Sequence, residues 1–80
     1  MDAREILQKV NVIFADILKN QQLLLDRESN VTTIEGWDSF NHIKLILTIE
    51  KQFFLKFSSA EIQSWKNIGD LCDTIDRKLS

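Results

Sequence analysis

The chain has 80 residues, 44% of them hydrophobic, and its 10 basic and 12 acidic side chains leave a net charge of -2. A chain of this size forms one domain, residues 1–80, and buries only about 60 to 65% of its unfolded surface, so a large catalytic cleft is not expected. The near-neutral charge gives no electrostatic footprint for nucleic acid or an anionic membrane, and with no proline and two glycines the composition favours an all-α fold.

The first predicted helix lies at the start of the chain. Asp2 followed by Glu5 is typical of a capping box, and the apolar residues after it recur at helical spacing. The pattern predicts a helix that ends before Asn20, with one apolar face made of Ile6, Leu7, Val10, Ile13, Phe14, Ile17 and Leu18.

A long loop is predicted after this helix, because the helical period is lost from Asn20 onward. The segment is rich in residues that compete for backbone hydrogen bonds outside helices, namely Ser29, Asn30, Thr32, Thr33 and Gly36. We expect Leu23 to Leu25 to cover one end of the core. Loops of this length are uncommon in compact domains and usually functional.

The second predicted helix starts at Asp38, whose carboxylate can accept hydrogen bonds from the free N–H groups of the first turn, and it runs to about Phe53. Ser39 then falls in that first turn. At about 100° per residue the apolar residues of this helix separate into two groups. One group is expected in the core: Leu45, Ile46, Ile49 and Phe53.

The second group, which we call the stripe, consists of Phe40, Ile43 and Leu47 at positions i, i+3 and i+7 and starts beside Ser39. Two interpretations are open. The stripe could widen the core-facing arc of the helix, or it could form a docking surface for partner enzymes.

Two further helices complete the all-α prediction. Ser58 with Glu61 makes a capping box that opens a short helix, which contains Ile62 and could extend to Trp65. Asn67 with Asp70 caps the last helix. Its predicted core face is made of Ile68, Leu71, Cys72, Ile75 and Leu79. The prediction is therefore three main helices and one short helix.

The cellular compartment and the absence of a metal site are also predicted from the sequence. Cys72 has no second cysteine for an internal disulfide, and no apolar signal segment stands at the N-terminus, so we expect a reducing cytoplasm. No apolar run approaches membrane-spanning length. One histidine and one cysteine thirty positions apart lack ligand spacing, so no metal site is expected.

Ser39 invites a hydrolase interpretation, with His42 as base and Asp38 as the third member. The geometry argues against it, because all three side chains radiate from one helical turn and cannot align as a triad. There is also no G-x-S-x-G elbow and no evident oxyanion hole. On these residues alone, Ser39 could simply be an ordinary helix-start residue, and His42 a surface or half-buried histidine.

The stretch GWDSFNHIKLILTIEKQFFLKF, residues 36–57, resembles the acyl carrier protein and peptidyl carrier protein family. The hallmark of that family is Asp-Ser-Leu at the start of the second helix, where this chain has Asp38, Ser39 and Phe40. An apolar ladder, an acidic residue and a Phe follow, here Ile43, Leu45, Ile46, Ile49, Glu50 and Phe53. The segment SWKNIGDLCDTI looks like the family's approach to its last helix. The resemblance covers the whole chain and implies a four-helix bundle of the acyl-carrier type.

The resemblance also implies a function. Ser39 would carry a 4′-phosphopantetheine arm, attached by a phosphopantetheinyl transferase that uses coenzyme A and supplies the activation and Mg²⁺. Asp38 would support this modification. The protein would be a monomeric, non-catalytic carrier that holds an acyl or related intermediate as a thioester and presents it to acyl-loading and acyl-processing enzymes.

Three residues depart from the pattern of carriers in fatty acid synthesis, which usually edge the stripe with acidic residues. Asn41, Lys44 and Lys51 stand at such places here, although Glu50 is acidic. The two lysines could be a solvated helix face. They could instead belong, with Phe40, Ile43 and Leu47, to a docking surface for other partners.

The second interpretation predicts a carrier in a specialised pathway, in secondary metabolism or in surface polysaccharide or lipid modification, and not the main carrier of fatty acid synthesis. An alternative of another class also stands: a small helical protein-interaction module whose serine is unmodified.

Overall fold

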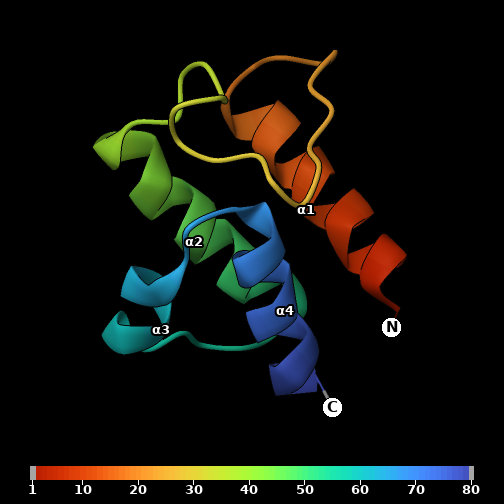
Figure 1. Cartoon of the computed structure of the whole chain (residues 1–80), viewed down its shortest axis with the longest axis vertical. Helices are drawn as coiled ribbons and strands as arrows, with labels where there is room; N and C mark the ends of the chain where they lie inside the picture. The colour runs from red at the N-terminus through yellow and green to blue at the C-terminus, as the bar shows by residue number, and fades with distance from the viewer. Residues whose placement is uncertain (1, 80) are drawn as a thin grey trace.

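The computed structural model describes residues 2–79, and within them it contains four α-helices and no strand: α1 (Ala3–Ile17), α2 (Ser39–Phe53), α3 (Ser59–Ser64) and α4 (Ile68–Leu79). α1 packs against both α2 and α4, and α3 packs against α4. The long loop between α1 and α2 passes over one end of the bundle, where α2 begins (Figure 1). The predicted all-α class, the helix order and the long loop are confirmed.

Each helix begins after a side chain that accepts a hydrogen bond from the backbone N–H three residues later, at 2.9 to 3.1 Å. Because the first N–H groups of a helix have no partner inside it, such acceptors define where a helix starts. At α3 the capping box is complete, since the Glu61 carboxylate also accepts from the Ser58 N–H. The four predicted helix starts are thereby confirmed, with caps at Asp2, Asp38, Ser58 and Asn67.

The core is formed by the apolar faces of α1, α2 and α4. Most of the predicted core residues are buried, and the buried set comprises Ile6, Val10, Ile13, Phe14, Leu25, Ile34, Leu45, Ile49, Phe53, Ile68, Leu71, Cys72 and Ile75. Four residues of the predicted apolar faces are only half-buried: Leu7, Ile17, Leu18 and Ile46. Burial raises the pKa of the Cys72 thiol to about 11, because the low-dielectric core disfavours the thiolate.

Two predicted core residues are exposed. Leu24 is 89% exposed because Asn11 bridges its neighbours: the Asn11 amide donates to the Leu23 carbonyl at 3.0 Å and accepts from the Leu25 N–H at 2.6 Å. This holds Leu23 and Leu25 against α1 and leaves Leu24 pointing outward. Leu79 is 41% exposed because it is the last residue of α4 and lies at the edge of the core.

The long loop is tied to the start of α4 by backbone hydrogen bonds. The Ile68 N–H donates to the Ser29 carbonyl at 2.8 Å, and the Gly69 N–H donates to the Arg27 carbonyl at 2.7 Å. A Cβ at Gly69 would lie 2.9 Å from that carbonyl oxygen, so glycine is needed for the close approach. Arg27 also pairs with Asp73 at 2.8 Å. The loop therefore supplies acceptors that α4 lacks by itself.

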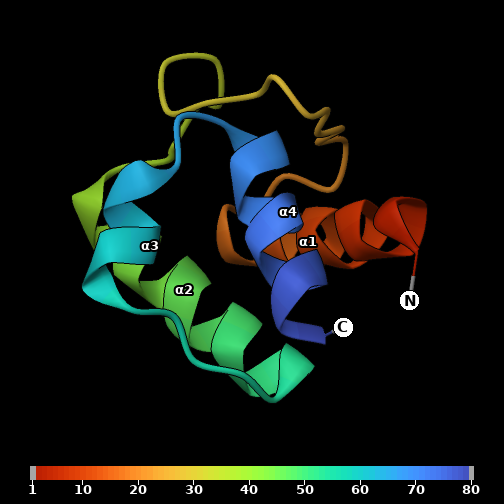
Figure 2. The ribbon, with the colours of Figure 1, turned by 60° about the horizontal axis from the view of Figure 1, so that its bottom comes forward.

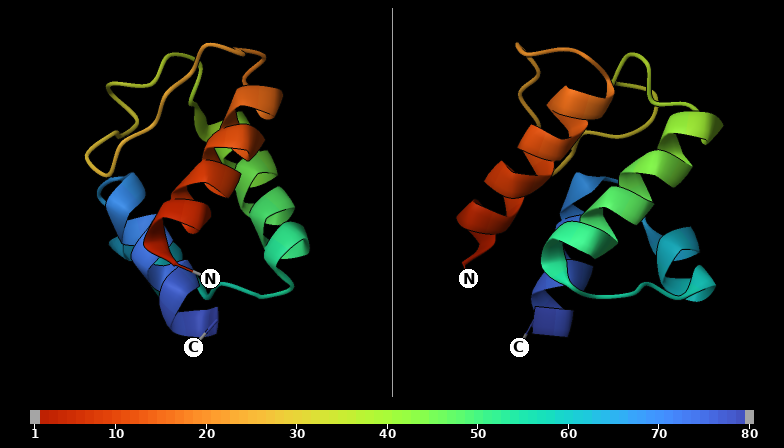
Figure 3. Two further views of the ribbon diagram at one scale, coloured as in Figure 1. Left: turned by 90° about the vertical axis from the view of Figure 1, so that its right-hand side faces the viewer. Right: turned by 180° about the vertical axis from the view of Figure 1, so that it is seen from behind.

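Two further views give the placement of the smaller elements. α3 is a short helix that sits beside α4 on the side of α2 (Figure 2). The loop lies at one end of the bundle, and the link from α2 to α3 lies at the other (Figure 3). In the described part of the chain, no helix is both long and apolar enough to cross a bilayer.

Candidate functional site

Ser39 is the first residue of α2, at the loop end of the bundle, and its side chain is exposed. The preceding Asp38 is the N-cap, and its Oδ1 atom accepts from the Asn41 N–H at 2.9 Å. The positive end of the helix dipole therefore lies beside the serine hydroxyl. A phosphate ester at Ser39 would be favoured at this position.

The approach to Ser39 is held in a fixed turn. Gly36 has a φ of +87°, in the left-handed region that favours glycine. Its carbonyl accepts from the Asn41 side-chain amide at 2.8 Å. Asn41 thus has a structural role in the turn, which explains this residue without reference to partner enzymes.

His42 is not positioned as a base for Ser39. Its Nδ1 atom accepts a hydrogen bond from the Trp37 indole N–H at 3.1 Å, and the two rings stack at 30° with centroids 6.0 Å apart. Partial burial lowers the pKa of His42, which favours the neutral ring that this hydrogen bond requires. The Trp37 ring is fixed in turn by an edge contact to Phe14, 5.0 Å between centroids. This geometry supports the argument, made from the sequence, that Asp38, Ser39 and His42 do not form a catalytic triad.

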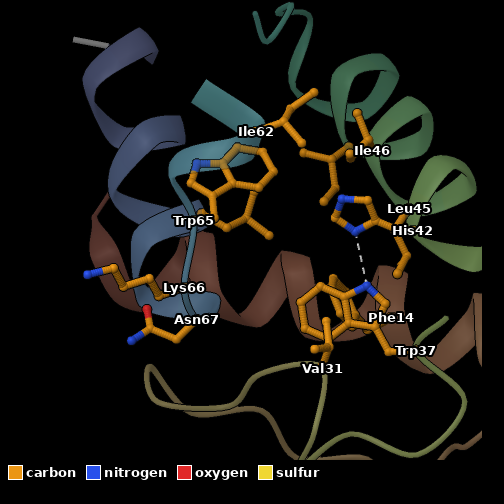
Figure 4. A pocket seen from close by; sticks show the side chains of 12 residues that line it. Phe14, Val31, Trp37, His42, Leu45, Ile46, Ile62, Trp65, Lys66 and Asn67 are labelled. Carbon is orange, nitrogen blue, oxygen red and sulfur yellow. Dashed lines mark hydrogen bonds between the residues drawn. The ribbon is translucent and has the colours of Figure 1, made fainter. Parts of the chain in front are cut away.

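Two hollows meet at the Trp37–His42 pair. The outer hollow, about 530 Å³, is lined by Val31, Trp37, Asp38, Ser39, His42 and Ile43. The inner cavity, about 180 Å³, lies between α2, α3 and the start of α4 (Figure 4). Its lining is Phe14, Val31, Trp37, His42, Leu45, Ile46, Ile49, Ile62, Trp65, Lys66, Asn67 and Leu71. The cavity explains why Ile46, predicted in the core, is only half-buried.

The stripe is exposed. Phe40, Ile43 and Leu47 have 71%, 60% and 58% of their surface accessible, so the interpretation as a widened core-facing arc is wrong. Three large apolar side chains in a row next to Ser39 form a patch of the kind that marks a binding surface.

The two lysines flank the stripe in different ways. The Lys44 ammonium lies over the Phe40 ring, 5.4 Å from its centroid, which is cation–π distance. Lys51 is exposed in the last turn of α2, where a cation is favoured by the helix dipole. Glu50 does not edge the stripe as a free acid, because its carboxylate accepts from the Phe57 N–H at 2.8 Å and orders the link to α3.

Sequence reasoning placed Ser39, Asp38 and the stripe together, but it missed the Trp37–His42 hydrogen bond and the inner cavity. Trp37 belongs to the loop and His42 to α2, and neither helical period nor capping relates a loop residue to a helix face. The cavity is lined by segments from residue 14 to residue 71, whose meeting depends on the tertiary fold. No local signal was available for either feature.

Comparisons with known proteins place the chain among small carriers. No family model matches the sequence. The acyl carrier protein of Phytoplasma mali is 31% identical over 74 residues, covering 92% of this chain and 88% of its own. The acyl carrier protein of Thermosynechococcus vestitus is 29% identical over 80 residues, covering 100% and 99%. The solution structure of a holo acyl carrier protein from Geobacter metallireducens matches with a TM-score of 0.87 and 36% identity, over 92% of this chain and 85% of that one.

Proposed function

The chain belongs to the acyl carrier protein family, and on that premise we propose that Ser39 carries a covalent 4′-phosphopantetheine arm through which the protein presents an acyl thioester to partner enzymes. The arm, when present, supplies the thiol that forms the thioester. Proteins of this family are non-catalytic carriers, and the chemistry belongs to the enzymes that they meet.

One observation carries the assignment to Ser39: it is an exposed serine at the first position of α2, directly after the Asp38 cap. A modifying enzyme can reach such a hydroxyl without disturbing the core. The first-turn N–H groups favour the added negative charge. Asp38 supports the modification by fixing the start of α2 through its hydrogen bond to the Asn41 N–H.

The proposed partners are a phosphopantetheinyl transferase that uses coenzyme A, and acyl-loading and acyl-processing enzymes. Their proposed docking surface is the stripe of Phe40, Ile43 and Leu47 with the flanking Lys44 and Lys51. Its position supports this role, because an enzyme that receives the Ser39 arm in its active site must lie against the adjoining surface of α2. Exposed apolar side chains would supply affinity, and the charges would select the partner.

The charges of this surface support a specialised pathway over the main route of fatty acid synthesis. Lys44 and Lys51 edge the stripe, and Glu50 is engaged by the Phe57 N–H. A partner with acidic or neutral groups opposite the lysines is the complementary one. We further propose that residues 1–80 act as one carrier domain, as a monomer in the cytoplasm.

Intact mass spectrometry tests the assignment to Ser39. Incubation with coenzyme A and a broad-specificity phosphopantetheinyl transferase should add one phosphopantetheine, mapped by peptide mass to Ser39, and Ser39→Ala should add none. Because Ser39 is exposed, this substitution should change the free energy of unfolding by about 1 kcal/mol or less.

Ser59 provides a matched control, since it is also exposed and also the first residue of a helix after a capping side chain. Ser59→Ala should be modified like the wild type. Absence of any mass increase with several transferases would favour the unmodified interaction module, and modification of Ser39→Ala would place the arm elsewhere.

A further inference from the structure

One side of α1 carries an ordered row of exposed charges around a valine. At about 100° per residue, positions 5, 9, 12 and 16 of this helix fall within about 60° of one another. We call this set the α1 face, and it consists of Glu5, Lys9, Val12 and Asp16, all of them exposed. In the left view of Figure 3, α1 lies in front of the other helices, and no other described element crosses its outer side.

The charged groups of the α1 face have no ionic partner among residues 2–79. Glu5 and Lys9 are four positions apart, a spacing at which Glu and Lys often pair on a helix, yet neither takes part in a salt bridge. The same is true of Asp16. The α1 face is therefore open to charges that come from outside the chain.

The order of these charges is self-complementary. Along α1 the face reads acid, base, valine, acid, and Lys19 adds an exposed base in the turn that follows. Read in the opposite direction, the order is base, acid, valine, base, acid. Two copies that lie antiparallel across Val12 therefore place Lys9 of each opposite Asp16 of the other, as a two-fold contact requires. Glu5 of each copy then lies near Lys19 of the other.

Two further hollows leave room for a second helix beside the α1 face. One, of about 540 Å³, is lined by Lys9 and Val12 together with Phe54, which follows α2. The other, of about 330 Å³, is lined by Val12 and Asp16 together with polar residues of α2. Val12 is 67% exposed and Phe54 is 95% exposed, so apolar surface lies among the charges. Burial of such surface supplies affinity, and the charges fix the register.

The size of the contact limits its strength. A stable dimer buries about 800 Å² on each partner, whereas the whole chain has an accessible surface of 5525 Å². One face of a single helix offers less area than a stable dimer needs. The pair is therefore weak and forms only at high protein concentration, and the monomer of the proposed function is the form present at low concentration.

We propose that the α1 face is a self-association surface, on which a second copy of the chain docks antiparallel through a two-fold contact centred on Val12. The inference goes beyond the proposed function and does not depend on Ser39. Ser39 and the stripe of α2 line neither of these hollows, so the pair leaves them free to meet enzymes. Loading assays at low concentration measure the monomer, and a change at Lys9 leaves them unaffected.

Sedimentation equilibrium of the unmodified chain tests whether it associates. Between about 20 µM and 1 mM protein, the weight-average mass should rise from that of one chain toward that of two, as mass action requires of a weak pair. The rise should shrink between about 50 mM and 500 mM salt, because salt screens exposed charges. A mass that stays at one chain at low salt would overturn the proposal and leave the α1 face to solvent or to another protein.

An exchange of charge between positions 9 and 16 tests the antiparallel register. Lys9→Glu and Asp16→Lys each bring like charges together across the two-fold, so each variant alone should lose the association. An equal mixture of the two variants should regain it, because the new glutamate of one chain meets the new lysine of the other. A chain with both substitutions should associate with itself for the same reason.

Arg4→Glu provides the matched control. It makes the same change in net charge as Lys9→Glu at an exposed residue of α1, but it lies on a different side of the helix. This variant should associate like the wild type. Circular dichroism of each variant checks that α1 still folds, which is expected because all the substituted side chains are exposed.

Three results would overturn the antiparallel contact. The first is a mixture that sediments like its separate components, and the second is a loss of association in Arg4→Glu equal to that in Lys9→Glu. The third is association that survives both single substitutions, which would place the contact on another surface, such as the stripe of α2. None of these results bears on the modification of Ser39, so the proposed function is decided separately by its own mass measurement.

Discussion

The two apolar faces of α2 have similar composition and opposite environments. Leu45, Ile49 and Phe53 are buried in the core to which α1 and α4 also contribute, whereas the stripe of Phe40, Ile43 and Leu47 is more than half exposed. Hydrophobicity alone does not separate them, since both contain one Phe with Leu and Ile. What separates the two faces is their angular position around the helix. Exposed apolar residues next to the proposed attachment site support the proposal that this face is a docking surface.

The comparison is tested most strongly by truncating one residue on each face. Ile49→Ala should lower the free energy of unfolding by about 2 to 5 kcal/mol, because it leaves a cavity in the core. Leu47→Ala, two positions away on the stripe, should change it by no more than about 0.5 kcal/mol. Urea denaturation midpoints of the two variants measure the difference. Similar midpoints for both would show that the faces are not distinct in role.

The next prediction tests the two lysines that flank the stripe. Lys44→Glu with Lys51→Glu should slow loading by the cognate enzyme by up to about tenfold, because rim charges mainly set the rate of encounter. Recognition by enzymes of fatty acid synthesis should improve. The melting temperature should fall only slightly. A small decrease is expected because the positive charge of Lys51 is favoured at the negative, C-terminal end of the α2 dipole.

A second double variant serves as the matched control. It makes the same change in net charge at two lysines that lie away from the stripe. Lys9→Glu with Lys56→Glu alters two exposed lysines outside α2 and should leave both loading rates near those of the wild type. Loading rates that do not distinguish the two double variants would mean that Lys44 and Lys51 are solvated charges, and the case for a specialised partner would lose its main support.

The smallest expected effect concerns His42, a residue of α2 with a lowered pKa. Between that lowered value and about 6.5, the unfolded state binds more protons at His42 than the folded state. His42 therefore contributes stability that is present above pH 6.5 and is lost as the pH falls through the lowered value. The ionisable groups that share its hollows are Asp38 and Lys66.

Thermal unfolding between pH 7.5 and 5 checks this for the wild type and for His42→Asn, whose amide oxygen can still accept from Trp37 but does not titrate. His42 is the only histidine of the chain, so the difference between the two curves isolates its titration. The wild type should lose more stability toward low pH. Parallel curves would contradict the assignment of a neutral, hydrogen-bonded His42.

Much of the fold followed from local patterns. Asp2, Asp38, Ser58 and Asn67 cap helices where predicted, because each bond spans only three residues. The two faces of α2 followed from the helical period. The roles of Ser39, Asp38 and the docking residues stay predictions, since they concern a modification and partners.

The sequence by itself determined the helices, their starts, their apolar faces and the resemblance that singled out Ser39, because capping and periodicity act within a few residues of the chain. Only the tertiary structure decided the outward turn of Leu24 through Asn11, the close contact of Gly69 with Arg27, and the Trp37–His42 hydrogen bond. These features join residues whose distance depends on the path of the long loop. That path is set by hydrogen bonds to α1 and α4, and no local propensity specifies them.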